Sequence, residues 1–159
     1  MTAPTIGLIS PGDMGHSIGA VLHGHGLRVL THLGGRSDRS RALASAAGLE
    51  DTPSLAALVQ EVDVLLSVLV PARALDLAQA VAAALTETGA SLLYVDCNAI
   101  APRTVREAEA IITGAGGRFV DAGIIGPPPK NVSGGPTNTR IYASGADAGE
   151  LTVLNDYGL

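Results

Sequence analysis

The chain has 159 residues, of which 47% are hydrophobic and 16% are charged, and its net charge at pH 7 is −5. This length and composition predict a single domain with a hydrophobic core and exclude a disordered chain. The acidic balance argues against a nucleic-acid partner, because neutralising nucleic-acid phosphates requires a basic surface.

The first half of the chain alternates between apolar runs and stretches whose apolar residues have helical spacing. Glycines follow the first two predicted helices, as expected at helix ends. In chain order we predict a strand over residues 5–9, a helix to about residue 25, a strand over 27–33, a helix capped by Asp38 or Ser40 and ending at residue 47, a short helix over 54–60, and a strand over 62–70.

The second half continues the alternation and then changes character. The prolines and glycines of residues 126–136 predict an irregular loop, since such a sequence cannot form regular structure. In chain order we predict a helix over residues 72–85, a strand over 91–96, a helix over 102–113, a strand over 118–122, the loop, a strand over 141–144, and helical turns over 146–154.

Residues 7–15, with the sequence GLISPGDMG, form the most informative segment. A glycine turn between a strand and a helix leaves backbone N–H groups free at the helix N-terminus, where the helix dipole favours a phosphate. Gly12 would let the backbone approach a pyrophosphate, and Gly15 would let the helix pack closely on the strand. Ser10 replaces the first glycine of the G-x-G-x-x-G pattern, so a plain strand–helix turn stays an alternative.

Together these elements predict an α/β fold of Rossmann type, a doubly wound and mainly parallel sheet with helices on both faces. Ligands of such sheets bind at the carboxyl ends of the strands. Unusual residues follow several predicted strands, and we expect one site to be formed by residues 12–15, 31–37, 69–71, 96–98 and 122–128.

The end of the second predicted strand indicates which dinucleotide is bound. A site selective for NAD usually has Asp or Glu there to hold the ribose 2′-hydroxyl, but no carboxylate occurs before Asp38. Arg36 can instead pair with a 2′-phosphate, and Thr31 and Ser37 can donate hydrogen bonds to it. We therefore predict NADP(H) in preference to NAD(H). The alternative is that Arg36 is a solvated loop arginine.

These motifs resemble the β-hydroxyacid dehydrogenase and 6-phosphogluconate dehydrogenase superfamily, whose chains open with GxIGLGxMG. The branch it most resembles carries a phosphogluconate-dehydrogenase-like C-terminal domain, and there GRS follows the second strand and DCNA the fifth. Residues 35–37 and 96–99 match those two motifs here. The resemblance covers essentially the whole chain and implies an NAD(P)-binding domain similar to that of 3-hydroxyisobutyrate dehydrogenases.

The resemblance also implies roles for individual residues. The pyrophosphate turn would be lined by Ser10, Pro11, Gly12, Asp13, Met14 and Gly15. The adenosine ribose and the linker would lie along Leu69, Val70 and Pro71. Asn98 would touch the nicotinamide ribose, and an amide after a buried strand can both donate and accept hydrogen bonds. A role for Asn98 as a turn former remains open.

One departure from the family concerns the substrate. The family's substrate segment, DAPVSGG, aligns with residues 121–127, which implies that a small-molecule substrate contacts Gly123, Ile124, Ile125 and Gly126. The serine that would help bind a substrate carboxylate is Ile125 here. Because an apolar side chain cannot hydrogen-bond an acid, we expect a bulkier or less polar substrate than a simple hydroxy acid.

A second departure concerns catalysis. The family's catalytic lysine belongs to a second, mostly helical domain that also forms the dimer, and the single lysine here, Lys130, does not match its position. We therefore expect residues 1–159 to be the NAD(P)-binding domain without the C-terminal helical catalytic and dimerisation domain. Apolar side chains around Ile124, Ile125 and the last strand would then be exposed and favour a homo-oligomer.

Other centres are not indicated. A single cysteine, Cys97, excludes an intrachain disulfide, and we expect it to be a small buried residue. His23 and His25 have no third ligand near them in the sequence, so no metal site is expected. The first strand begins almost at once, without a leader, and no apolar run is long enough for a membrane span, which predicts a cytoplasmic protein without a membrane partner.

The function that these features favour is hydride transfer to or from a hydroxyl, carbonyl or imine substrate, with little turnover by this chain alone. One alternative is a non-catalytic NADP(H)-binding or sensing module, or a module that works with a separate helical partner chain. Another is a different user of the fold, such as a methyltransferase, against which stands the missing acidic residue after the second strand.

Overall fold

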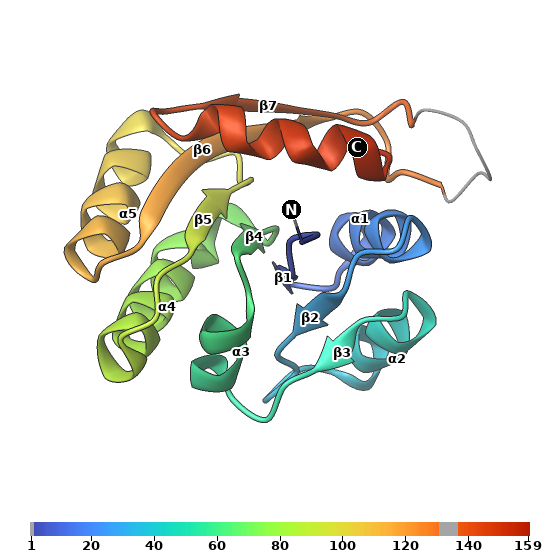
Figure 1. Cartoon of the computed structure of the whole chain (residues 1–159), viewed down its shortest axis with the longest axis horizontal. Coiled ribbons are helices and arrows are strands. Elements are labelled where there is room, and N and C mark those ends of the chain that lie inside the picture. The colour runs from blue at the N-terminus through green and yellow to red at the C-terminus, as the bar shows by residue number, and fades with distance from the viewer. Residues whose placement is uncertain (1, 131–136) are drawn as a thin grey trace.

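A computed structural model describes residues 2–130 and 137–159, which form a seven-stranded sheet in the order β3-β2-β1-β4-β5-β6-β7 (Figure 1). The neighbouring pairs are parallel except β6 and β7, which are antiparallel. The strands are β1 (Ile6–Ile9), β2 (Val29–Thr31), β3 (Glu50–Asp51), β4 (Val64–Ser67), β5 (Leu93–Asp96), β6 (Arg118–Ile125) and β7 (Arg140–Ser144).

Helices cover both faces of the sheet, which confirms the predicted doubly wound α/β fold. The α-helices are α1 (Asp13–Gly24), α2 (Asp38–Ala46), α3 (Leu55–Glu61), α4 (Ala74–Thr88) and α5 (Pro102–Gly114). Two 3₁₀ helices are η1 (Pro71–Arg73) and η2 (Ala148–Tyr157). Side chains of α1, α2 and η2 pack on one face, and side chains of α3, α4 and α5 pack on the other.

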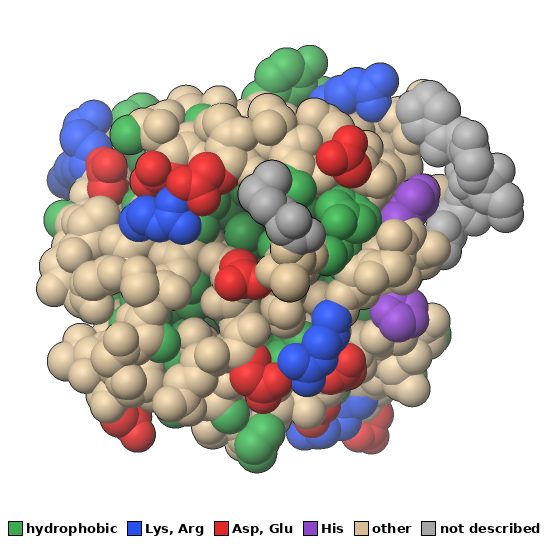
Figure 2. All heavy atoms as spheres, in the orientation of Figure 1, with side chains coloured by type: hydrophobic (Ala, Val, Ile, Leu, Met, Phe, Trp, Pro, Cys, Tyr) green, Lys and Arg blue, Asp and Glu red, His purple; other side chains and the backbone are tan. Residues whose placement is uncertain are grey.

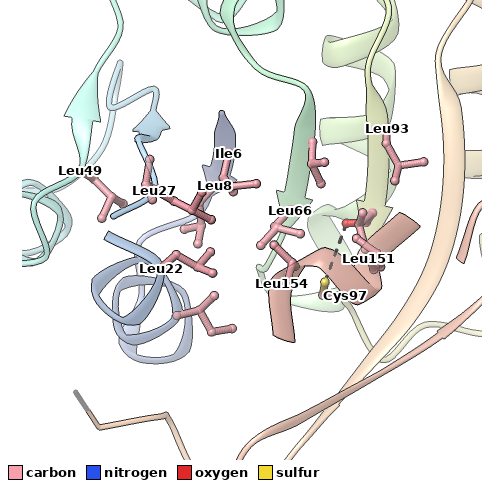
Figure 3. Close-up of a cluster of buried hydrophobic side chains, with 14 of the residues drawn as sticks. Ile6, Leu8, Leu22, Leu27, Leu49, Leu66, Leu93, Cys97, Leu151 and Leu154 are labelled. Atoms are coloured by element: carbon pink, nitrogen blue, oxygen red, sulfur yellow. Dashed lines mark hydrogen bonds between the residues drawn. The ribbon is translucent and has the colours of Figure 1, made fainter. Parts of the chain in front are cut away.

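The core on the α1 face joins the two ends of the chain. Leu8 of β1 and Leu66 of β4 project from the sheet toward Leu22 of α1 and toward Leu151 and Leu154 of η2 (Figure 3). These side chains are at most 8% exposed. Burying a leucine side chain contributes about 1.5–3 kcal/mol, so this cluster fixes α1 and η2 on the sheet.

Local signals set the helix ends. The Ser37 hydroxyl accepts a hydrogen bond from the Ser40 N–H at 3.2 Å, and the Ser54 hydroxyl accepts one from the Ala57 N–H at 3.0 Å. Each cap of this kind is worth about 1 kcal/mol. The cap of α2 is therefore Ser37, and the predicted caps, Asp38 and Ser40, were wrong. Gly89 ends α4 in the left-handed region with φ 69°.

Several predicted boundaries are corrected by the structure. Strand β3 was not predicted, because its two residues are charged and exposed and give no apolar signal. The strand predicted to end at residue 122 continues to Ile125, since β7 pairs with it from Asp121 onward. In the loop predicted over residues 126–136, positions 131–136 lie outside the described residues.

The surface is mixed in charge. On the face drawn in Figure 2, basic and acidic side chains lie side by side without an extended area of one sign. Among the ion pairs of the described residues, Arg28 is 2.7 Å from Glu50 and 2.8 Å from Glu61. Among the helices in the described ranges, none is both long enough and apolar enough to cross a membrane.

Candidate functional site

A cavity of about 820 Å³ opens at the carboxyl edge of the sheet, beside β1 and β4. From β1 the chain proceeds to β2 and β3 on one side, and from β4 it proceeds to β5 and β6 on the other. This reversal of strand order is where doubly wound sheets bind ligands. Among the predicted site residues, those that line the cavity are Ser10, Gly12, Asp13, Met14, Gly15, Arg36, Leu69, Val70 and Pro71.

The glycine turn leaves room where a phosphate would bind. A Cβ atom on Gly12 would meet nothing within 4 Å, whereas a Cβ on Gly15 would lie 2.1 Å from the carbonyl oxygen of Ser10. Gly15 is therefore required for the close packing of α1 on β1, as predicted. Gly12 leaves its side of the turn open at the cavity. The turn therefore leaves open space at the cavity.

The N-terminus of α1 has no side-chain cap. Gly12 is its N-cap residue, and the first helical hydrogen bond is donated by the His16 N–H to the Gly12 carbonyl at 2.9 Å. The N-termini of α2 and α3 are instead capped by serine hydroxyls. The first N–H groups of a helix carry a partial positive charge, so those of α1 are donors for an anion in the cavity.

The charges that line the cavity are unequally paired. Asp13 is 2.7 Å from Arg39, and Asp76 is 3.2 Å from Arg73. The Arg36 guanidinium instead donates a hydrogen bond to the neutral hydroxyl of Ser10. In the part of the chain that the structure describes, Arg36 has no carboxylate within ion-pair distance. Its positive charge is therefore available to an anion.

The wall contributed by β4 is supported from behind by Asn98. The Leu69 N–H donates to the Asn98 side-chain oxygen at 2.8 Å, and the Asn98 side-chain nitrogen donates to the Ser67 hydroxyl at 2.9 Å. Asn98 itself is only 5% exposed and does not line the cavity. Val70, in contrast, is 64% exposed. In this structure Asn98 positions the turn that carries Leu69 and Val70.

Three further residues predicted to contact the cofactor lie outside the cavity lining. Thr31 is fully buried, and within the described residues its hydroxyl has no hydrogen-bond partner. Pro11 is buried beneath the turn. The Ser37 hydroxyl caps α2 and donates to the Ser40 hydroxyl at 3.2 Å. Arg36 therefore lines the cavity, whereas Thr31 and Ser37 do not.

Two carboxyl groups lie side by side on neighbouring strands, Asp96 at the end of β5 and Asp121 opposite it within β6. Asp96 is fully buried, and one of its oxygens accepts a hydrogen bond from the Asn98 N–H at 2.9 Å. Its other oxygen has no partner among the described residues. Burial raises the pKa of Asp96, against the opposing effect of the hydrogen bonds with Asn98, and burial also raises the pKa of Asp121. Neither side chain lines the cavity.

Cys97 and the histidines give no sign of a chemical centre. Cys97 is buried, as predicted, and burial raises the pKa of its thiol, which keeps the thiol protonated and unreactive. Across the described ranges, no group of three or more His, Cys, Asp or Glu side chains is arranged to hold a metal ion.

The predicted substrate segment is a strand rather than a loop. Gly123, Ile124 and Ile125 belong to β6 and pair with β7, and none of them lines the cavity. The Ile125 side chain is 63% exposed, while Ile124 packs against the core. Gly126 follows with φ 118°, and a Cβ there would lie 2.6 Å from the Asn138 carbonyl oxygen.

Sequence reasoning missed one wall of the cavity, which the end of η1 and the first turns of α4 form. This wall comprises Arg73, Asp76, Leu77 and Ala80. Their spacing of three, four and seven residues places them on one face of a helix. That spacing was readable in the sequence, but which face of α4 meets the cavity is decided by how the helix packs. Ile9, Gly35 and Val68 complete the lining.

A family model described as the NAD binding domain of 6-phosphogluconate dehydrogenase matches residues 5–154. A search of curated proteins finds no significant match.

Solved structures share the fold. MTH1747, a conserved protein reported as structurally similar to 3-hydroxyacid dehydrogenases, is 34% identical with a TM-score of 0.81, and the match covers 98% of this chain and 55% of that one. A conserved hypothetical protein from Sinorhizobium meliloti 1021 is 26% identical with a TM-score of 0.80, covering 99% and 52%. The 3-hydroxyisobutyrate dehydrogenase of Mycobacterium tuberculosis is 22% identical with a TM-score of 0.76, covering 99% and 53%, and shows likeness of fold alone. The chain spans about half the length of these proteins.

Proposed function

The chain belongs to the family of the NAD-binding domain of 6-phosphogluconate dehydrogenase, and we propose that it binds NADP(H) as the cofactor domain of a hydride-transfer oxidoreductase. This membership confirms the resemblance drawn from the GLISPGDMG segment. It establishes that the chain is an NAD(P)-binding domain of dehydrogenase type. One cavity supports the preference for NADP(H). It is lined both by the glycine turn, whose helix has no side-chain cap, and by Arg36, whose guanidinium has no acidic partner among the described residues.

Different residues of the cavity would bind different parts of the cofactor. The N–H groups of the first turn of α1 would hold the pyrophosphate, and Gly12 lets the backbone approach it. Leu69, Val70 and Pro71 offer an apolar wall for the adenosine ribose and the linker. The bound nicotinamide would supply or accept the hydride, while the protein fixes its orientation and excludes water.

The preference for NADP(H) follows from the charges at the end of β2. Arg36 presents a planar fork of donors that matches a phosphate group. Asp51 of β3, the strand next to β2, accepts a hydrogen bond from the Leu33 N–H at 2.8 Å and does not line the cavity. Asp51 is thus occupied with the backbone, and the carboxylates that do line the cavity, Asp13 and Asp76, are paired with Arg39 and Arg73.

Substrate chemistry belongs to the same proposal. We assign a substrate with a hydroxyl, carbonyl or imine group, and the dehydrogenase names among the solved relatives support the first two. Lys130, the single lysine of the chain, does not line the cavity. We propose that the proton-transfer group comes from a helical domain or a separate partner chain, and that residues 1–159 alone bind cofactor with little turnover.

The test of this function is a fluorescence titration of the purified chain with NADPH and with NADH, repeated with Arg36→Ala. NADPH should bind more tightly than NADH, and the Arg36→Ala variant should lose about ten- to a hundredfold in NADPH affinity with little change for NADH, because only NADPH carries the 2′-phosphate. Arg106→Ala is the matched control, since Arg106 is an exposed arginine on α5, outside the cavity.

Equal affinities for the two cofactors that Arg36→Ala leaves unchanged would contradict the NADP(H) assignment. Binding without turnover, even after addition of a helical partner chain, would favour the alternative of a sensing module over the oxidoreductase.

A further inference from the structure

We propose that Ser10, which stands where the glycine pattern has its first glycine, is a positioning residue that sets cofactor specificity by holding the Arg36 guanidinium at the cavity. This inference rests on the proposed function and extends it, because it explains how a flexible arginine is oriented to receive a 2′-phosphate. The relevant contact is the hydrogen bond from Arg36 to the Ser10 hydroxyl.

The backbone of Ser10 is fixed from several sides. Its N–H donates to the Val68 carbonyl at 2.9 Å, and its own carbonyl accepts from the Gly12 N–H at 2.8 Å. Gly15 packs so closely on that carbonyl that a Cβ would lie 2.1 Å from it. Ser10 is 5% exposed. Its hydroxyl therefore occupies a fixed place at the end of β1, unlike a hydroxyl on a surface loop.

Arg36, in contrast, is held loosely except at its head group. It lies in the loop between β2 and α2, where its N–H donates to the Leu33 carbonyl at 3.0 Å. An arginine side chain loses rotamer entropy when it is ordered. If the Ser10 hydroxyl already orders the guanidinium in the free protein, this entropy is not lost when the ligand binds, and the ligand binds more tightly.

The partner of Arg36, the Ser10 hydroxyl, is neutral, whereas the other arginines at the cavity are paired with carboxylates. Asp13 and Asp76 neutralise Arg39 and Arg73, so those arginines offer less charge to a ligand. A serine hydroxyl orients Arg36 without cancelling its charge. An arginine has five N–H donors, so one hydrogen bond to Ser10 leaves donors for a phosphate. The hydroxyl and the phosphate therefore bind Arg36 together rather than in competition.

The experiment is a double-mutant cycle on the 159-residue chain, with dissociation constants for NADPH and NADH measured by calorimetry. Ser10→Ala should weaken NADPH binding by about tenfold and leave NADH unchanged, so that the ratio of the two affinities falls. Ser10→Gly, which restores the usual glycine, should behave in the same way. In the Arg36→Ala background, Ser10→Ala should have no further effect.

Ser17→Ala is the matched control, because the Ser17 hydroxyl bonds to the Asp13 carbonyl at 2.8 Å and Ser17 does not line the cavity. Thermal unfolding of each variant checks that the fold is retained.

Three results overturn the inference. Equal losses for NADPH and NADH would mean that Ser10 only maintains the turn. Tighter NADPH binding by Ser10→Ala would mean that the hydroxyl competes with the phosphate. An effect of Ser10→Ala that persists without Arg36 would mean that it does not act through Arg36. In each of these cases the unmodified chain still prefers NADPH, whereas failure of the unmodified chain to bind either cofactor would overturn the proposed function and this inference with it.

Discussion

Arg36 and Asp96 show how the surroundings of a charged residue determine what it can do. Among the described residues no carboxylate balances the charge of Arg36, because Arg36 donates to the neutral Ser10 hydroxyl while the carboxylates that line the cavity are paired with other arginines. Asp96 is fully buried without a cation beside it in the described structure, and its pKa is raised. At neutral pH the first residue is suited to hold an anion, and the second carries a cost to stability.

The buried carboxyl of Asp96 should make the stability of the fold depend on pH. Because burial raises its pKa in the folded state, the folded chain binds more protons than the unfolded chain between about pH 4 and the folded pKa. The free energy of unfolding should therefore fall as pH rises through that window. Each unit of pKa difference corresponds to about 1.4 kcal/mol.

Asp96→Asn should flatten this pH profile, as measured by urea unfolding at several pH values between 4 and 7. The asparagine keeps an oxygen for the Asn98 N–H, so the local hydrogen bond is retained. Glu107→Gln, which changes an exposed carboxylate on α5, is the control and should follow the parent chain. Parallel profiles for the parent and Asp96→Asn would show that Asp96 does not cause the dependence.

At the scale of elements, the packing of α1 on β1 depends on Gly15. A methyl group there would lie 2.1 Å from the Ser10 carbonyl oxygen, so Gly15→Ala must move the helix away from the strand. We expect a loss of about 1–3 kcal/mol in the free energy of unfolding, measured by denaturant titration. Gly12→Ala is the matched control, because its methyl group meets nothing within 4 Å. Similar losses in both variants would point to backbone conformation rather than to packing.

The sequence correctly predicted element boundaries that are marked by local signals. Helix α5 begins at Pro102 and strand β5 ends at Asp96, as predicted, because proline, glycine and the buried apolar runs act locally. Strand β6 was underestimated because its last residues are held by pairing with β7 rather than by an apolar pattern. Strand β3 gave no signal, since Glu50 and Asp51 are both exposed.

The candidate site could be predicted from the sequence where the position of the backbone alone determines which residues meet. Parallel strands bring the residues after β1, β2 and β4 to one edge, so Ser10, Arg36 and Leu69 meet in one cavity. The direction of a side chain was harder to predict. Both faces of β2 are covered by other elements, so the Thr31 side chain is fully buried. The Asn98 amide is used to hold Leu69.

At the scale of the whole molecule, one exposed apolar face stands out. Ile125 and Tyr142 are 63% and 64% exposed. In the register of β6 and β7, Ile125 lies opposite Arg140, two residues from Tyr142, so both side chains project from the same face of the ribbon. The prediction that Ile125 would be exposed is confirmed, whereas Ile124 is only partly exposed because it packs against the core.

This face should cause reversible self-association, since exposed apolar patches favour contact between copies. Sedimentation velocity at increasing concentration should show a rising sedimentation coefficient, and the double substitution Ile125→Ser and Tyr142→Ser should abolish the rise. Val70→Ser serves as the comparison, because Val70 is equally exposed but lies at the cavity. A chain that stays monomeric at high concentration would contradict the prediction.

The order in which the chain is synthesised gives the cavity an unusual property. All the residues that line it lie between Ile9 and Ala80. Asn98, which braces the wall at Leu69, comes later in the chain. On the ribosome, every residue that lines the cavity is therefore synthesised before Asn98, the residue that braces its wall.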